Sequence, residues 1–251
     1  MDNLKDAMEY LVNMAVPHTI NMIGNRGETV TFVDKTMRQL MPKSNIPRVS
    51  DEDWIRMSTL TSLVEYLKAN IDVEQEAMIL HVVSPTEVRY YSALNENRER
   101  ERLVRVIANV PDFSFGRFMD QENFVISLQS KFIPGEDRDL LLKFAGTVEE
   151  GTVQTYGDDG VTQKATIKTG LASKSDALVP NPVHLRPYRT FIEVTQPESQ
   201  FIFRMKQDKY DGVTSAIFEA DGGAWVNEAM HNIKEYLKFE LEGLDNITVI
   251  S

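Results

Sequence analysis

The chain has 251 residues, and its 42% of hydrophobic residues are enough to bury the core of one large globular domain or two modest ones. It contains no cysteine, which excludes disulfides, thiolate nucleophiles and cysteine-ligated metals and agrees with a reducing cytosol. The formal net charge of −11 argues against nucleic-acid binding through a diffuse basic surface and leaves only a local basic patch open.

Membrane and export signals are not expected. No apolar run approaches the roughly 20 residues of a membrane-spanning helix, and the first residues lack a basic region followed by an apolar one. The acidic residues are scattered among lysines and arginines, which favours a role in solubility over the imitation of DNA by one acidic face.

Short elements joined by turns are expected in the first 70 residues. Residues 2–15 repeat apolar side chains at helical spacing, and this helix would either dock on its own chain or exchange between copies. Ser58 or Thr59 can cap a later helix. In order, the expected elements are a helix at 2–15, strands at 19–23 and 28–33, a loop at 42–47 and a helix at 58–70.

An antiparallel meander is expected next. Three runs rich in β-branched residues predict its strands at 78–83, 88–93 and 103–110. Residues 95–102, NENRERER, lie between the second and third strands. Their charges alternate in sign and no aromatic residue is interleaved, so a solvated hairpin tip is favoured over a nucleic-acid site.

A pair of helices and a hairpin are expected after residue 119. Asp120 can cap the first helix, and the second helix is expected over 135–148. The hairpin would consist of strands at 152–156 and 161–169. Asp158 and Asp159 in its turn lack the ligand spacing of a calcium loop, so turn chemistry is favoured over a calcium site.

The stretch 180–225 has the densest strand and turn pattern of the chain. Alternation of Phe201, Phe203 and Met205 on one face predicts a half-buried strand that pairs with the strand expected at 191–195 in a tight hairpin. The run Asp221-Gly222-Gly223 allows a sharp reversal into a helix. The expected elements are strands at 191–195, 201–206 and 213–220 and a helix at 225–241.

Together these elements predict an α+β fold in which mostly antiparallel sheets, built from hairpins and meanders, pack with several amphipathic helices. Pro111 and Gly116 interrupt the periodic segments. We therefore expect a division into residues 1–115 and 116–251, as two domains or as two parts of one continuous domain.

Motifs for catalysis are not found in the sequence. It has no glycine-rich phosphate loop, no dinucleotide fingerprint and no nucleophile elbow. No two of its four histidines share a short metal-ligand spacing. We expect no catalytic residues, no metal and no cofactor, and a binding role is favoured over an enzymatic one.

One polar set in the central stretch is a candidate for ligand binding or for an interface. Its members are Arg186, Arg189, Glu193, Gln196, Arg204, Glu219 and Asp221. The planar, two-pronged guanidinium groups could hold a phosphate or carboxylate, with a nearby acid as base. Without a nucleophile or a metal set, mutual pairing across a sheet face or a subunit interface is favoured.

Six segments of the chain carry a family resemblance. They are PNPVHLRPYRTFIEV, QPESQFIFRM and AIFEADGGAW in the central stretch, and SLVEYL, FMDQENF and DDGVTQKATIKTG before it. From about residue 60 onward the chain resembles a bacteriophage and prophage family typified by YfdQ, whose function is unknown. The resemblance implies an early-expressed protein in the cytoplasm of an infected or lysogenic bacterium.

Three functions stay open. The favoured one is a non-enzymatic phage protein that self-assembles into a homo-oligomer, ring-like or cage-like, and acts by binding. The second is a decoy or inhibitor of a host defence protein or of a nucleotide signal. The third is an enzyme acting on a nucleotide or phosphoester, with Arg189 or Arg204 on the anion and Glu193 or Glu219 as base.

Overall fold

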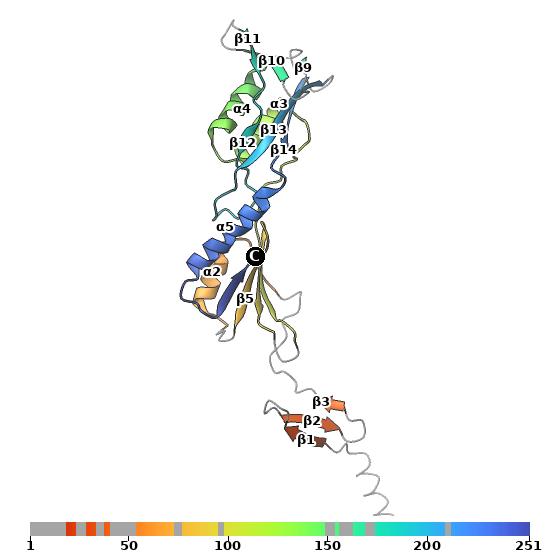
Figure 1. The fold of residues 1–251 in the computed structure, drawn as a ribbon, viewed down its shortest axis with the longest axis vertical. Helices are drawn as coiled ribbons and strands as arrows, with labels where there is room; N and C mark the ends of the chain where they lie inside the picture. Colours follow the sequence, from red (N-terminus) through yellow and green to blue (C-terminus); the bar gives the residue numbers. More distant parts are fainter. Residues whose placement is uncertain are drawn as a thin grey trace, which may run out of the picture. The chain divides into compact units, whose positions relative to one another are not determined.

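The chain divides into two compact units, Met1–Arg48 and Val49–Ser251. The computed structural model describes three strands of the first unit and, in the second, residues 54–72, 77–94, 98–148, 154–155, 163–168, 174–208 and 212–251. The three strands form an antiparallel sheet in the order β1 (Thr19–Ile23), β2 (Thr29–Val33), β3 (Arg38–Leu40) (Figure 1). The first two strands were predicted, whereas the predicted helix at 2–15 and loop at 42–47 lie outside the described residues.

A five-stranded sheet is the centre of the first core of the second unit. Its order is β15 (Ile247–Ile250), β5 (Met78–Ser84), β6 (Glu87–Ser92), β7 (Arg102–Ile107), β4 (Ile55–Met57). The three middle strands form the antiparallel meander that the sequence predicts. Both outer strands run parallel to their neighbours.

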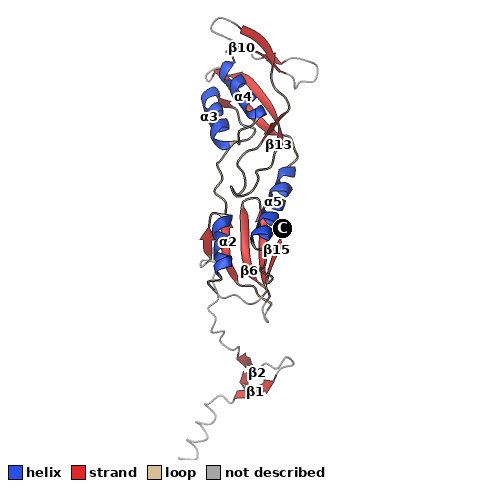
Figure 2. Ribbon diagram, turned by 90° about the vertical axis from the view of Figure 1, so that its left-hand side faces the viewer, coloured by secondary structure: helices blue, strands red, loops and turns tan. Residues whose placement is uncertain are grey.

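Helices α2 (Leu60–Ala69) and α5 (Ala224–Glu240) cover one face of this sheet (Figures 1 and 2). Apolar residues of both helices, such as Leu63 and Ile233, share one buried cluster with Leu80 and Val104 of the sheet. The Thr59 hydroxyl caps α2 by accepting a hydrogen bond from the amide of Ser62 at 3.2 Å. The opposite face of the sheet carries no helix in the described part of the chain.

A four-stranded antiparallel sheet forms the second core. Its order is β12 (Val183–Leu185), β13 (Ser199–Asp208), β14 (Gly212–Glu219), β8 (Met119–Asp120). Aromatic packing joins this sheet to helices α3 (Gln121–Lys131) and α4 (Glu136–Thr147). The centre of the Phe203 ring lies 5.5 Å from the centre of the Phe124 ring and 6.5 Å from that of Phe144. The remaining strands form a small antiparallel sheet in the order β11 (Lys174–Leu178), β10 (Gln163–Lys168), β9 (Gln154–Thr155).

The predicted helix pair is confirmed. The Asp120 carboxylate caps α3 by accepting a hydrogen bond from the Asn123 amide at 2.9 Å, and the second helix begins after Gly135. Hydrogen bonds from the Asn123 amide and side chain lower the pKa of Asp120 below its ordinary value.

The fold is α+β with mostly antiparallel sheets, as the sequence predicts. Both hydrophobic cores belong to the unit Val49–Ser251, and the chain passes from the first core to the second between Val110 and Phe113. The expected division into residues 1–115 and 116–251 stays a prediction. Among the described residues, no helix has the length and apolar character to cross a bilayer.

One predicted strand is wrong. Residues 191–195 form a turn, and the partner of β13 is instead β12, with Val183 opposite Phe201. Phe191 and Val194 both point into the first core, where they are buried, and this spacing of three residues does not fit a strand.

Candidate functional site

The seven residues that the sequence proposes do not form one site. Arg189, Gln196, Glu219 and Asp221 come together at the start of α5, and we call them, with Ser199 and Trp225, the Arg189 cluster. The other three lie elsewhere.

Arg189 is the centre of this cluster and is only 8% exposed. Its guanidinium donates one hydrogen bond to Glu219 Oε1 at 2.9 Å and another to the hydroxyl of Ser199. The guanidinium carbon also lies 4.0 Å from the centre of the Trp225 ring, a cation–π contact. One side chain therefore joins β13, β14 and α5.

The charges in the cluster compensate one another. Burial lowers the pKa of Arg189 to about 10, although the nearby carboxylates of Glu219, Asp221 and Glu228 oppose this shift. Burial alone would raise the pKa of Asp221, but the Ser199 hydroxyl, the Gly223 amide and the charge of Arg189 outweigh it and hold that pKa below its ordinary value.

Gln196 closes the turn that precedes the cluster. Its buried side-chain oxygen accepts hydrogen bonds from the amides of Arg189 and Thr190 at 3.0 and 3.2 Å, and its amide group donates to the carbonyl of Phe191 at 2.9 Å. The Thr190 hydroxyl in turn donates to the carbonyl of Pro85, in the turn between β5 and β6. The Arg189 cluster is therefore bonded to both cores of the second unit.

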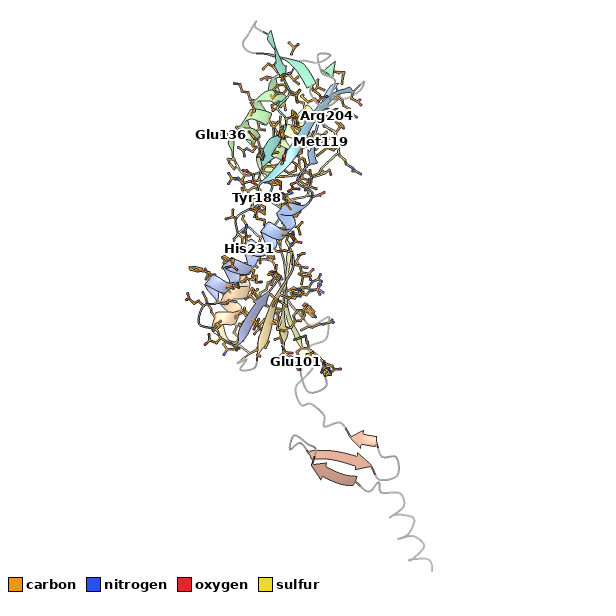
Figure 3. The ribbon with its side chains drawn as sticks, in the orientation of Figure 1. Glu101, Met119, Glu136, Tyr188, Arg204 and His231 are labelled. Atoms are coloured by element: carbon orange, nitrogen blue, oxygen red, sulfur yellow. The ribbon has the colours of Figure 1, made fainter. Side chains whose placement is uncertain are left out.

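Glu193, Arg186 and Arg204 lie apart from the cluster. Glu193 accepts a hydrogen bond from the Thr61 amide at 3.2 Å, where the amino terminus of α2 favours negative charge. Arg186 lines a hollow of about 310 Å³ beside the start of α4, together with Asp137. Arg204 is a half-buried residue of β13, which belongs to the four-stranded sheet of the second core (Figure 3).

A second group of polar residues covers the face of the five-stranded sheet opposite α2 and α5. We call it the arginine face. Strand alternation explains it: in β5, Leu80 and Val82 point into the core, so Ile79 and His81 point to the opposite side. The charged and aromatic members of the arginine face are Trp54, Arg56, His81, Arg89, Tyr91, Arg98, Arg100, Arg102 and Arg105.

The strand register places three arginines opposite one another. Arg56 of β4 is opposite Arg105 of β7, Arg105 is opposite Arg89 of β6, and Arg89 is opposite His81 of β5. Like charges directly opposite each other destabilise a sheet. A row of arginines of this kind is therefore not explained by folding alone.

A carboxylate, Glu87, compensates part of this charge. Its Oε1 accepts hydrogen bonds from the Nε atoms of Arg105, at 2.8 Å, and of Arg89. Burial would raise the pKa of Glu87, but the two arginines outweigh it and hold that pKa below its ordinary value. In β4, β6, β7 and the β6–β7 hairpin, the other described carboxylates are Glu99 and Glu101, whereas the same segments hold six described arginines.

Two aromatic rings lie among these arginines. The rings of Trp54 and Tyr91 meet edge to face with their centres 6.2 Å apart. The guanidinium carbons of Arg89 and Arg102 lie 5.7 and 5.9 Å from the centre of the Trp54 ring. Planar guanidinium groups and aromatic rings thus share one surface, to which β4, β6 and β7 contribute.

The arginine face is hollowed in two places. The larger hollow, about 510 Å³, lies beside β5 and the β6–β7 hairpin, whose base is marked by Glu101 in Figure 3. The smaller one, about 240 Å³, is lined by Trp54, Arg56 and Arg105. Arg89 and Arg102 line both hollows, so the two lie side by side on this face of the sheet.

Sequence reasoning missed this surface. It assigned residues 95–102 to a solvated tip because no aromatic residue is interleaved, but the fold brings Trp54 and Tyr91 beside the arginines of that hairpin. The alternation of Arg89 and Tyr91 along one strand face was the signal available in the sequence.

Neither group resembles a metal site. Within the described ranges, no group of three or more histidine, aspartate or glutamate side chains is arranged to hold a metal ion. Comparison of the chain with family models, with curated proteins and with solved structures found no match.

Proposed function

We propose that this protein acts by binding, without catalysis, and that the arginine face holds a polyanionic ligand. The observation that carries this proposal is the row of directly opposed arginines, Arg56, Arg105 and Arg89, on a sheet face that no described helix covers. We also propose, from the resemblance above, that the protein serves a bacteriophage or prophage in the host cytoplasm.

The physical reason is electrostatic. Glu87 compensates only part of the repulsion between the opposed guanidinium groups of the free protein, and a ligand with closely spaced negative charges reduces the remainder when it binds. The flat fork of arginine also matches the geometry of phosphate and carboxylate groups better than lysine does. The whole chain has a formal net charge of −11, so it offers a polyanion few other places to bind.

The test uses inorganic polyphosphate with a fluorescent end label and measures its affinity by anisotropy. Arg56→Gln/Arg105→Gln should weaken binding by about tenfold and flatten its dependence on salt, because two cationic contacts are lost. This variant keeps the pair of Arg89 with Glu87.

The matched control is Arg117→Gln/Lys143→Gln, which removes the same charge from exposed positions of the second core. It should bind as the unmodified protein does. Equal weakening in both variants would mean that only net charge matters, and an unmodified protein that does not bind polyphosphate would exclude the proposal.

A second candidate function is self-association into a homo-oligomer, ring-like or cage-like. The observation that favours it is an exposed apolar surface beside α5, where Ile192 is 78% and Phe239 is 74% exposed. The turn that carries Ile192 is bound to α5, because Asn232 donates a hydrogen bond to the Thr195 carbonyl, and Phe239 lies two helical turns after Asn232. Exposed apolar residues of this size favour contact with a second copy.

Sedimentation velocity over a range of concentrations tests this candidate. We expect the unmodified protein to sediment as an oligomer and Ile192→Glu/Phe239→Glu to sediment as a monomer, because charge at the contact opposes burial. Ile126→Glu, at an exposed position of α3, should stay oligomeric. A concentration-independent monomer before any substitution would exclude self-association.

The decoy and enzyme alternatives stay predictions.

A further inference from the structure

The aromatic rings on the arginine face are not explained by a polyanion alone. A chain of phosphates needs cations, whereas Trp54 and Tyr91 add partly exposed ring surface among them. We propose that the ligand of the arginine face is single-stranded nucleic acid, whose bases stack on these two rings. This inference rests on the proposed function, because the same arginines would hold the phosphates.

Stacking requires rings that are fixed and accessible. Trp54 is held by its edge-to-face contact with Tyr91, and Arg89 and Arg102 lie close to its ring. Aromatic side chains with arginine partners are the platforms on which single-stranded nucleic acids stack in many proteins, since every base has a π-face. The arrangement therefore suits bases and phosphates together.

The dimensions also suit a single strand. The row of Arg56, Arg105, Arg89 and His81 crosses four neighbouring strands, a distance of about 15 Å at the ordinary strand spacing, which corresponds to a few nucleotides. Arg98 and Arg100 of the β6–β7 hairpin extend the cationic surface beyond the sheet, on the rim of the larger hollow. A backbone can follow these cations while its bases turn toward the sheet.

A duplex fits this surface less well. Its bases are stacked inside, so it would offer phosphates to the arginines but no base face to the rings of Trp54 and Tyr91. The apolar residues that line the larger hollow, Ile79, Leu94 and Ile250, would likewise meet no base. Unpaired bases supply the flat apolar surface that these residues lack.

Among the described residues, the local charge agrees with this ligand even though the whole chain is acidic; Asp51, Glu52, Asp53 and Glu96, close by in the sequence, lie outside the described residues. The described residues of the sheet face and hairpin hold six arginines against three carboxylates, of which Glu87 is already bound to two of the arginines. Phosphates would be attracted to this face and repelled by the acidic remainder, so binding should be confined to it and should weaken as salt is added.

The experiment compares three labelled probes of equal length by fluorescence anisotropy: an oligothymidine, the same strand with abasic sites throughout, and inorganic polyphosphate. We expect the unmodified protein to bind the oligothymidine about tenfold more tightly than the abasic strand. Trp54→Leu/Tyr91→Leu should remove this difference and leave the affinity for polyphosphate unchanged. Trp54→Phe/Tyr91→Phe should keep most of the difference, since phenyl rings also stack.

A control variant and an independent signal accompany these measurements. Phe118→Leu removes an exposed ring of the second core that has a lysine, Lys206, 4.4 Å above its centre, and it should change nothing. The chain has two tryptophans, so quenching of the intrinsic fluorescence by the oligothymidine should disappear in Trp54→Leu, where Trp225 alone remains.

The outcomes separate this inference from the proposed function. If the unmodified protein binds the abasic strand and polyphosphate as tightly as the oligothymidine, the stacking inference is overturned while polyanion binding stands. Tighter binding of a duplex of the same sequence would also overturn it. If none of the three probes binds, both proposals fail.

Discussion

Replacing Arg189 with alanine is expected to lower the free energy of unfolding by about 3–5 kcal/mol. The substitution leaves Glu219 without its partner at 2.9 Å and removes the charge that helps to hold Asp221 ionised. It also empties the space above the Trp225 ring. Urea unfolding followed by circular dichroism measures the loss.

The loss should depend on pH. The pKa of Asp221 in the folded protein is below its ordinary value, so this carboxylate contributes stability that is present above about pH 4 and is lost as the pH falls through the folded pKa. Arg189 supplies part of that contribution. The difference between the unmodified protein and Arg189→Ala should therefore be larger at pH 7 than at a pH below the folded pKa of Asp221, where this carboxylate is protonated.

Two further variants control this prediction. Arg189→Lys keeps the positive charge but not the fork that reaches both Glu219 and Ser199, and it should lose an intermediate amount of stability. Arg117→Ala, at an exposed position, should change the free energy of unfolding by no more than about 0.5 kcal/mol. A loss at Arg189 no larger than this would show that the cluster does not join the two cores.

Replacing Phe203 with alanine is expected to cost about 3–5 kcal/mol of stability. The side chain is fully buried, stacks on Phe124 at 5.5 Å and meets the edge of Phe144 at 6.5 Å. Truncation leaves a cavity between β13 and both helices of the second core. Thermal and urea unfolding measure the effect.

Matched substitutions show whether the effect comes from burial. Phe203→Leu keeps most of the apolar volume and should lose much less, about 1–1.5 kcal/mol. Phe239→Ala removes the same ring from a position that is 74% exposed and should be close to neutral. Similar losses at Phe203 and Phe239 would contradict the packing of the second core as described.

Local features of the chain were predictable from the sequence. The apolar spacing and the Thr59 cap indicated α2, and Asp120 indicated the start of α3. The meander β5–β6–β7 was also expected, because its strands are close in the chain and alternate clearly. The strands β13 and β14 were expected too, but the predicted hairpin paired residues 201–206 with 191–195 and not with β14. Each of these signals is contained within one short segment, so no distant partner is needed to recognise it.

The outer strands β4 and β15 were not predicted. Each has only three or four residues, and each pairs with a strand that is far away in the sequence, so neither carries a local signal. The turn at 191–195 was mistaken for a strand because its β-leaning residues are held by burial of Phe191 and Val194 in the first core and by Gln196. Tertiary contacts overrode the local preference.

The candidate sites show the same difference between what one segment indicates and what contacts between distant segments decide. Proximity in the sequence suggested that residues 186–221 act together, but Arg186, Glu193 and Arg204 are carried to separate places by the elements that hold them. The arginine face, in contrast, unites Trp54 with residues some 35 to 50 positions later.

By itself, then, the sequence determined the helices of the second unit, the β5–β6–β7 meander and the α+β class, because periodicity, capping and turn chemistry act over a few residues. Only the tertiary structure decided which charges pair with acids, as Arg89 and Arg105 do with Glu87, and which arginines are placed opposite one another across a sheet. The reason is strand register: it sets Arg56, Arg105 and Arg89 opposite one another, and register is a property of strand pairing that no single segment contains.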